Sequence, residues 1–163
     1  MGTDDWLDVS EKAARTVLSS SPTPRPAMAA RLALGLVASQ RGDLAEAGEQ
    51  YVAIEPLRAA YPEDRYICIS VDRLLALLSV TLNHPVPAVG HFEDALTFCR
   101  KAGYRPELAW SLCDYADMLL ERNDEGDRQK AMRHLDESLA ISTELGMRPL
   151  MERVLSRREI LKA

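Results

Sequence analysis

The sequence predicts an all-α fold in which three helix hairpins stack into an α-α superhelix, with a capping helix at each end. Three observations predict it. Alanine and leucine dominate the apolar residues, and aromatic residues make up only 6% of the 163, a balance that favours helices over sheets. In the segments between prolines, glycines and polar turns, apolar residues recur three and four positions apart. One spacing pattern also occurs three times, about 40 residues apart.

The first expected helix covers residues 4–19 and is separated from the rest by the Ser- and Pro-rich residues 19–26, because proline cannot continue a helix interior. An apolar stripe at helical spacing lies on this helix and consists of Trp6, Val9, Ala13 and Val17.

The next two helices are expected over 26–41 and 44–60. Gly42 between them suits the left-handed position after a helix, and Asp43 with Glu46 forms a start that resembles a capping box. Pro56 interrupts the second of these helices, so a kink or a restart is expected there.

Later breaks fall at Pro62, at His84–Pro87 and at Asn123–Gly126. Five helices, with no strand between them, are expected over 63–82, 86–102, 106–122, 128–145 and 149–162. The last helix carries an apolar stripe consisting of Met147, Leu150, Met151, Val154 and Leu155.

Composition excludes several classes of protein. A net charge of −5 argues against direct nucleic-acid binding, which needs clustered Lys and Arg. No apolar run is long enough to span a bilayer, and the acidic N-terminus does not resemble a secretory signal. Three isolated cysteines, Cys68, Cys99 and Cys113, suit buried or half-buried thiols in a reducing cytoplasm, so a cytoplasmic protein is expected.

Motifs for catalysis, cofactors or metals are not found in the sequence, so no enzyme activity, cofactor or metal site is expected. His91 and His134 occupy the same repeat position, which favours a shared structural role. Asp114, Asp117 and Glu121 could bind a cation, but a solvated or ion-paired helix face is the preferred interpretation. The basic residues at the start of the seventh helix, Arg128, Lys130 and Arg133, are interpreted as members of surface salt bridges.

The internal repeat is the most specific signal. Small residues recur at one position, an alanine follows at a second, and larger side chains come four residues later. The three copies align on Gly35, Ala76 and Ala116, then on Ala47, Ala88 and Ala131, then on Tyr51, Phe92 and Leu135, and finally on Ile54, Ala95 and Ser138. A separate duplication places the sequence Gly-x-Arg-Pro at both Gly103–Pro106 and Gly146–Pro149.

These positions resemble the tetratricopeptide pattern, in which small residues allow two helices to cross closely. The resemblance implies a single tetratricopeptide-like domain over residues 1–163. Its parts are an N-terminal helix and linker at 1–25, repeats at 26–60, 61–103 and 104–146, and a capping helix at 147–163.

The last 100 or so residues, from His91–Leu96 through Tyr115–Ala116 to Glu144–Met147, are also similar to the helical-repeat region of LuxR-type transcriptional regulators and of signal-transduction ATPases, some linked to adenylate cyclase. That region is regulatory in the family. The resemblance therefore implies a non-catalytic protein-interaction module, either excised from a larger protein or a stand-alone relative.

The resemblance further implies a concave groove that binds a protein or peptide partner. Its expected lining consists of Leu32, Leu36, Gln40, Arg73, Leu77, Trp110, Asp117 and Glu121. The apolar stripe of the last helix is expected to pack around Leu135 and Leu139, with its charged face in water and the groove open. Three alternatives remain: the terminal helices or a second copy in a homodimer fill the groove, the chain senses a small ligand, or it is a stand-alone scaffold.

Overall fold

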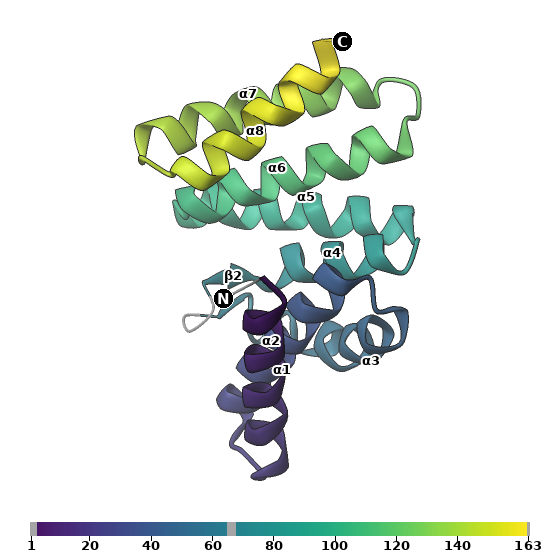
Figure 1. Cartoon of the computed structure of the whole chain (residues 1–163), viewed down its shortest axis with the longest axis vertical. Coiled ribbons are helices and arrows are strands. Elements are labelled where there is room, and N and C mark those ends of the chain that lie inside the picture. The colour runs from purple at the N-terminus through teal and green to yellow at the C-terminus, as the bar shows by residue number, and fades with distance from the viewer. Residues whose placement is uncertain (1–2, 65–67, 163) are drawn as a thin grey trace. The chain divides into compact units, whose positions relative to one another are not determined.

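The computed structural model describes residues 3–64 and 68–162 and confirms an all-α fold over these ranges (Figure 1). The helices in chain order are α1 Thr3–Ser19, α2 Pro24–Arg41, α3 Leu44–Ile54, α4 Val71–Thr81, α5 Pro85–Ala102, α6 Arg105–Arg122, α7 Asp127–Glu144 and α8 Arg148–Lys162. A 3₁₀ turn, η1, covers Glu55–Leu57.

The expectation of an uninterrupted fourth helix over 63–82 is wrong. Strand β1, Glu63–Asp64, pairs antiparallel with strand β2, Ile69–Ser70, and α4 begins only at Val71. The Val71 amide donates to the carbonyl of Pro62 at 3.1 Å, which closes this ribbon. Residues 65–67 of the expected helix lie outside the described residues. Cys68, which follows them, is exposed and not buried or half-buried as predicted, whereas Cys99 and Cys113 are buried.

The expected third helix, 44–60, is shorter than predicted because α3 ends at Ile54 and the 3₁₀ turn follows, with Pro56 in its middle. Its start agrees with prediction, since the Asp43 carboxylate accepts from the amides of Ala45 and Glu46 at 3.0 and 3.1 Å. The capping box is only half formed, because the Asp43 amide donates to the carbonyl of Ala38 instead.

The chain forms two compact units, residues 1–91 and 92–163. In the first unit, α2 is packed by α1, α3 and α4. Its main core consists of Met28, Leu32, Ala38, Ala47, Ile54, Ile69, Val71, Leu74, Leu75 and Leu78. A smaller cluster of Ala14, Ala30 and Leu34 joins α1 to α2. A methyl group on Gly35 would lie 3.2 Å from Leu74 Cδ2, so this glycine permits close contact between α2 and α4.

The predicted apolar stripe of α1 is mostly exposed. Trp6 and Val9 are 59% and 55% accessible to solvent, and Ala13 is exposed as well. The side of α1 that packs on α2 carries Ala14, Val17 and Leu18 instead. Of the predicted stripe, only Val17 contributes to the packing.

In the second unit, α6 packs along α7, and α8 packs on α7 and touches α6. The predicted stripe of the last helix is confirmed in part, because Leu150 and Val154 are fully buried and Met147 and Met151 are half-buried. Leu155, at the end of the stripe, is 46% exposed. The two copies of Gly-x-Arg-Pro form the same turn, with Gly103 and Gly146 at φ 68° and 66°. Equivalent hydrogen bonds close both turns, from Tyr104 N to Cys99 O at 2.9 Å and from Met147 N to Ser142 O at 2.8 Å.

The repeat alignment predicted core positions correctly. Every aligned residue of the three copies is buried except Tyr51, which is half-buried. In the third copy, the Ser138 hydroxyl donates 2.8 Å to the Ala109 carbonyl across the α6–α7 contact, so a small polar residue satisfies its hydrogen bond where the other copies have Ile54 and Ala95.

Candidate functional site

The predicted groove residues are divided between the units. Five lie in the first unit, namely Leu32, Leu36, Gln40, Arg73 and Leu77, and three in the second, namely Trp110, Asp117 and Glu121.

Leu32 is not a groove residue. Its side chain is 0% exposed in the main core of the first unit, because α2 is packed by three helices and has little free surface. Leu36 is half-buried against the same core, Arg73 and Leu77 are half-buried on α4, and Gln40 is exposed. A partner could contact these four residues, but Leu32 could not take part.

The second unit brings the other three predicted residues to one side of α6. Trp110, Asp114, Asp117 and Glu121 are spaced at about one helical turn and so share a face of the helix. Two arginines of α8 contact this face. We use the name α6–α8 ledge for Trp110, Asp117, Glu121, Arg153 and Arg157.

Ion pairs join the two helices of the ledge. Arg153 donates from one terminal nitrogen to Asp114 Oδ1 and to Asp117 Oδ2, both at 2.7 Å. Arg157 Nε donates to Asp117 Oδ1 at 2.7 Å. The Arg153 guanidinium carbon also lies 5.8 Å from the centre of the Trp110 ring, within the range of a cation–π contact.

These contacts correct the prediction that the charged face of the last helix lies in water and leaves Asp117 open. Arg153 and Arg157 turn toward α6, and both Asp117 oxygens are occupied. The reason is local, since the Asp114 side chain is 4% exposed and a buried carboxylate needs a charged or hydrogen-bonding partner. Asp114 and Asp117 are thus ion-paired, which agrees with the sequence interpretation of an ion-paired helix face. Glu121 is exposed.

Burial and charge act in opposite directions on the ledge. Burial lowers the pKa of Arg153, but the carboxylates of Asp114 and Asp117 more than offset it, so the pKa is raised and the charge is permanent. Burial raises the pKa of the neighbouring Cys113 thiol to about 12, which keeps it protonated at neutral pH. Cys113 is therefore a poor nucleophile, and the ledge provides fixed charges and an indole ring rather than a reactive group.

A second polar cluster, in the first unit, was not predicted. Asp72 Oδ1 accepts from Arg58 at 2.9 Å and lies 3.3 Å from His91 Nδ1, while His91 Nε2 lies 3.0 Å from the Tyr51 hydroxyl. Such a series of hydrogen-bonded side chains could carry a proton, but His91 is only 7% exposed, so a substrate could not reach the imidazole. No sequence motif marks the cluster, because its members are scattered along the chain.

The repeat-equivalent His134 has different surroundings. Its ring stacks on Tyr115 at 5.0 Å between ring centres, and Tyr115 stacks on Phe92 at 4.9 Å. Lys130 contacts the Tyr115 hydroxyl at 2.7 Å and Glu93 at 2.5 Å. The predicted salt bridge of Lys130 is therefore confirmed, although its partner is on α5 rather than in the preceding loop.

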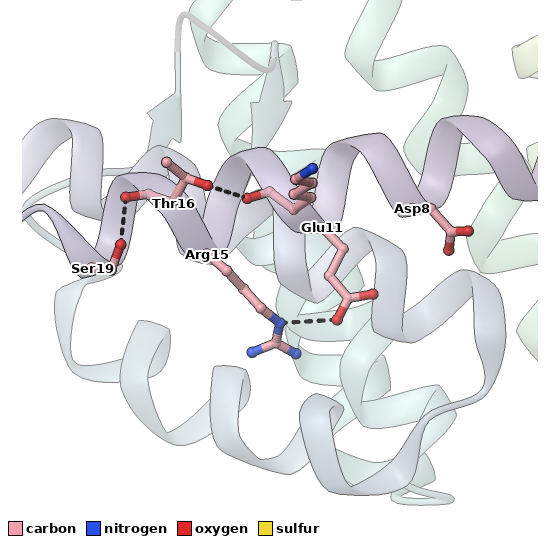
Figure 2. A pocket seen from close by; sticks show the side chains of 6 residues that line it. Asp8, Glu11, Arg15, Thr16 and Ser19 are labelled. Atoms are coloured by element: carbon pink, nitrogen blue, oxygen red, sulfur yellow. Dashed lines mark hydrogen bonds and ion pairs between the residues drawn. The ribbon is translucent and has the colours of Figure 1, made fainter.

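A shallow charged hollow on α1 was not predicted from the sequence (Figure 2). Three of its side chains, Asp8, Glu11 and Arg15, are already engaged. Arg15 contacts Glu11 at 2.9 Å and Glu46 of α3 at 2.7 Å, while Arg41 of α2 contacts both Glu11 and Asp8. These pairs attach α1 to the neighbouring helices.

Within residues 3–64 and 68–162, no cluster of three or more His, Cys, Asp or Glu side chains is arranged to hold a metal ion. Over the same residues, no helix combines the length and apolarity needed to cross a membrane. No family model, curated protein or solved structure matches the chain significantly.

Proposed function

We propose that the chain is a non-catalytic, tetratricopeptide-like regulatory module of a bacterial transcriptional regulator or signalling protein, and that it binds a peptide segment of a partner on the α6–α8 ledge. The observation that carries this proposal is the half-exposed combination of the Trp110 indole ring on α6 with two ion-paired arginines on α8. Buried repeat positions and the duplicated turn support the repeat fold that the proposal assumes.

The ledge favours recognition over chemistry. The Arg153 and Arg157 side chains are 37% and 43% exposed, so they can reach a partner while Asp114 and Asp117 hold them in place. Arginines that are already positioned lose little conformational freedom when they bind a carboxylate. Trp110 beside them offers apolar contact of the kind that often dominates binding energy.

This arrangement defines the expected ligand. A partner peptide would place an acidic side chain or its terminal carboxylate near Arg157 and an apolar side chain on Trp110, with Glu121 available to a donor at the far end of the ledge. Binding would add charge-assisted hydrogen bonds to a site whose geometry is already formed.

The test uses the two tryptophans of the chain. In Trp6→Phe protein, Trp110 is the only indole, so its fluorescence reports on the ledge directly. Peptides selected from a random display library should be enriched in acidic and apolar residues and should shift this emission. Arg157→Ala should weaken their binding at least tenfold, by about 1.4 kcal/mol or more.

Arg148→Ala is the matched control, because Arg148 is an exposed arginine at the start of the same helix. It should leave both the melting temperature and peptide binding unchanged. Selected peptides that bind equally well to Arg157→Ala and Trp110→Ala proteins, with both variants folded, would contradict the proposed site.

A further inference from the structure

The N-terminal helix exposes apolar surface that nothing in the first unit covers among the described residues. Trp6 and Val9 are more than half exposed, and Ala13 continues their line one turn later. A tryptophan exposed to this degree beside a valine is costly in water, so the surface suits an interface.

A shallow apolar hollow of about 510 Å³ adjoins this line, between the second half of α1 and the first half of α2. Its lining is made of small or short side chains, including Ser10, Ala13, Val17, Pro26, Ala29 and Ala33. The hollow has room for a large side chain, and Trp6 is a large side chain on the same face of α1.

The spacing of Trp6 and the hollow along α1 would allow Trp6 of one copy to enter the hollow of a second copy. A two-fold axis between Val9 and Ser10 would place Trp6 of each copy opposite Ala13 of its mate, in the lining of the hollow. The two residues are about 10 Å apart along α1, so the helices would overlap for roughly two turns. A surface that carries both the protruding and the receiving group is self-complementary, as a two-fold interface requires.

The charged side of α1 stays outside this interface. Asp8, Glu11 and Arg15 lie on another side of α1, where they pair with Arg41 of α2, with Glu46 of α3 or with each other (Figure 2). The surface that would meet a second copy is therefore mainly apolar. An antiparallel pair brings Trp6 to the hollow, whereas a parallel two-fold pair would place Trp6 beside Trp6.

We propose that two copies of this chain associate through antiparallel packing of their α1 helices, with each Trp6 seated in the hollow of the other copy. The interface is small, so dissociation in the micromolar range is expected. This inference does not depend on the peptide site, which lies in the other unit.

Sedimentation equilibrium of the full chain tests the proposal. The wild type should be a dimer whose dissociation constant rises at least tenfold in Val9→Glu and Trp6→Ala proteins. The matched control is Val52→Glu, because Val52 is a 73% exposed valine on α3, away from the hollow. A protein that remains monomeric at hundreds of micromolar, or a dimer equally weakened by Val52→Glu, would overturn the proposal.

Cross-linking gives an independent readout. In a Cys68→Ser background, which removes the exposed thiol and leaves the buried Cys99 and Cys113, Val9→Cys lies next to the proposed axis. Mild oxidation should convert most of this protein to a covalent dimer, because the two thiols meet across the axis. Val52→Cys should not cross-link. The reverse result would place the interface elsewhere and reject the antiparallel α1 pair.

Discussion

His134 shows how one buried side chain makes stability depend on pH. Burial lowers its pKa to about 4 from the ordinary 6.5, and the positive charge of Lys130 acts in the same direction. Its Nε2 atom has no hydrogen-bond partner among the described residues. Between pH 6.5 and pH 4, the unfolded chain therefore binds more protons than the folded chain, and stability is lost as pH falls through this window.

Lowering the pH from 7 to 5 should therefore reduce the free energy of unfolding by about 1–2 kcal/mol through His134. His134→Phe keeps a ring against Tyr115 and removes the titration, so urea unfolding at the two pH values should show a smaller loss for this variant. His84→Gln, at an exposed position in a turn, should keep the wild-type dependence. An unchanged loss in His134→Phe would place the titrating group elsewhere.

At this scale, the repeat alignment predicted buried positions but not what they contact, and the predicted stripe of α1 is mostly exposed. Ala131 and Leu135 were assigned to the core by the repeat alignment alone, and both are fully buried. The ion pairs of Arg153 with Asp114 and Asp117 join residues far apart in the chain, and neither composition nor helical spacing specifies such pairs. Leu32 was misassigned because the resemblance assumes a free face on a helix that three neighbours cover.

At the scale of helices, close crossings depend on small side chains. Ala131→Leu should destabilise the protein by about 1–3 kcal/mol, because α6 and α7 leave no room for the larger side chain. Ala140→Leu is the control, since Ala140 is exposed on the same helix. Thermal unfolding of the two variants measures the difference in their stability, and equal melting temperatures would show that the repeat register is misplaced.

Helix ends were predicted well where glycine, proline or a capping residue marks them. Gly42, Gly103 and Gly146 all have positive φ and follow helices that end within a residue or two of expectation. The failure at the start of α4 has a different cause. Acidic residues after Pro62 suit a first helical turn, yet the chain pairs Glu63–Asp64 with Ile69–Ser70 in a short hairpin, and this pairing outweighs the helical preference of the acidic residues.

At the scale of the whole molecule, α8 completes the second unit. It supplies buried Leu150 and Val154 to the packing on α7, and it supplies Arg153 to the buried Asp114. Deleting residues 147–163 should therefore expose apolar surface on α7, leave a buried carboxylate without its arginine, and cause aggregation.

Light scattering and size-exclusion chromatography of the truncated protein measure this outcome. A variant with Leu155→Ser and Ile160→Ser is the control, because both side chains are exposed on α8. It should remain dispersed and fold normally. A truncated protein that stays soluble with an unchanged melting temperature would show that the second unit is complete without its last helix.

The duplicated Gly-x-Arg-Pro turn has a consequence for how such a chain can change in length. Gly103 and Gly146 leave the backbone in the same state, with equivalent hydrogen bonds before and after each turn. The segment between them therefore begins and ends with turns of the same geometry. A deletion or duplication of this segment in the gene would preserve the turn geometry, so the chain could shorten or lengthen by one whole helix hairpin in a single genetic step.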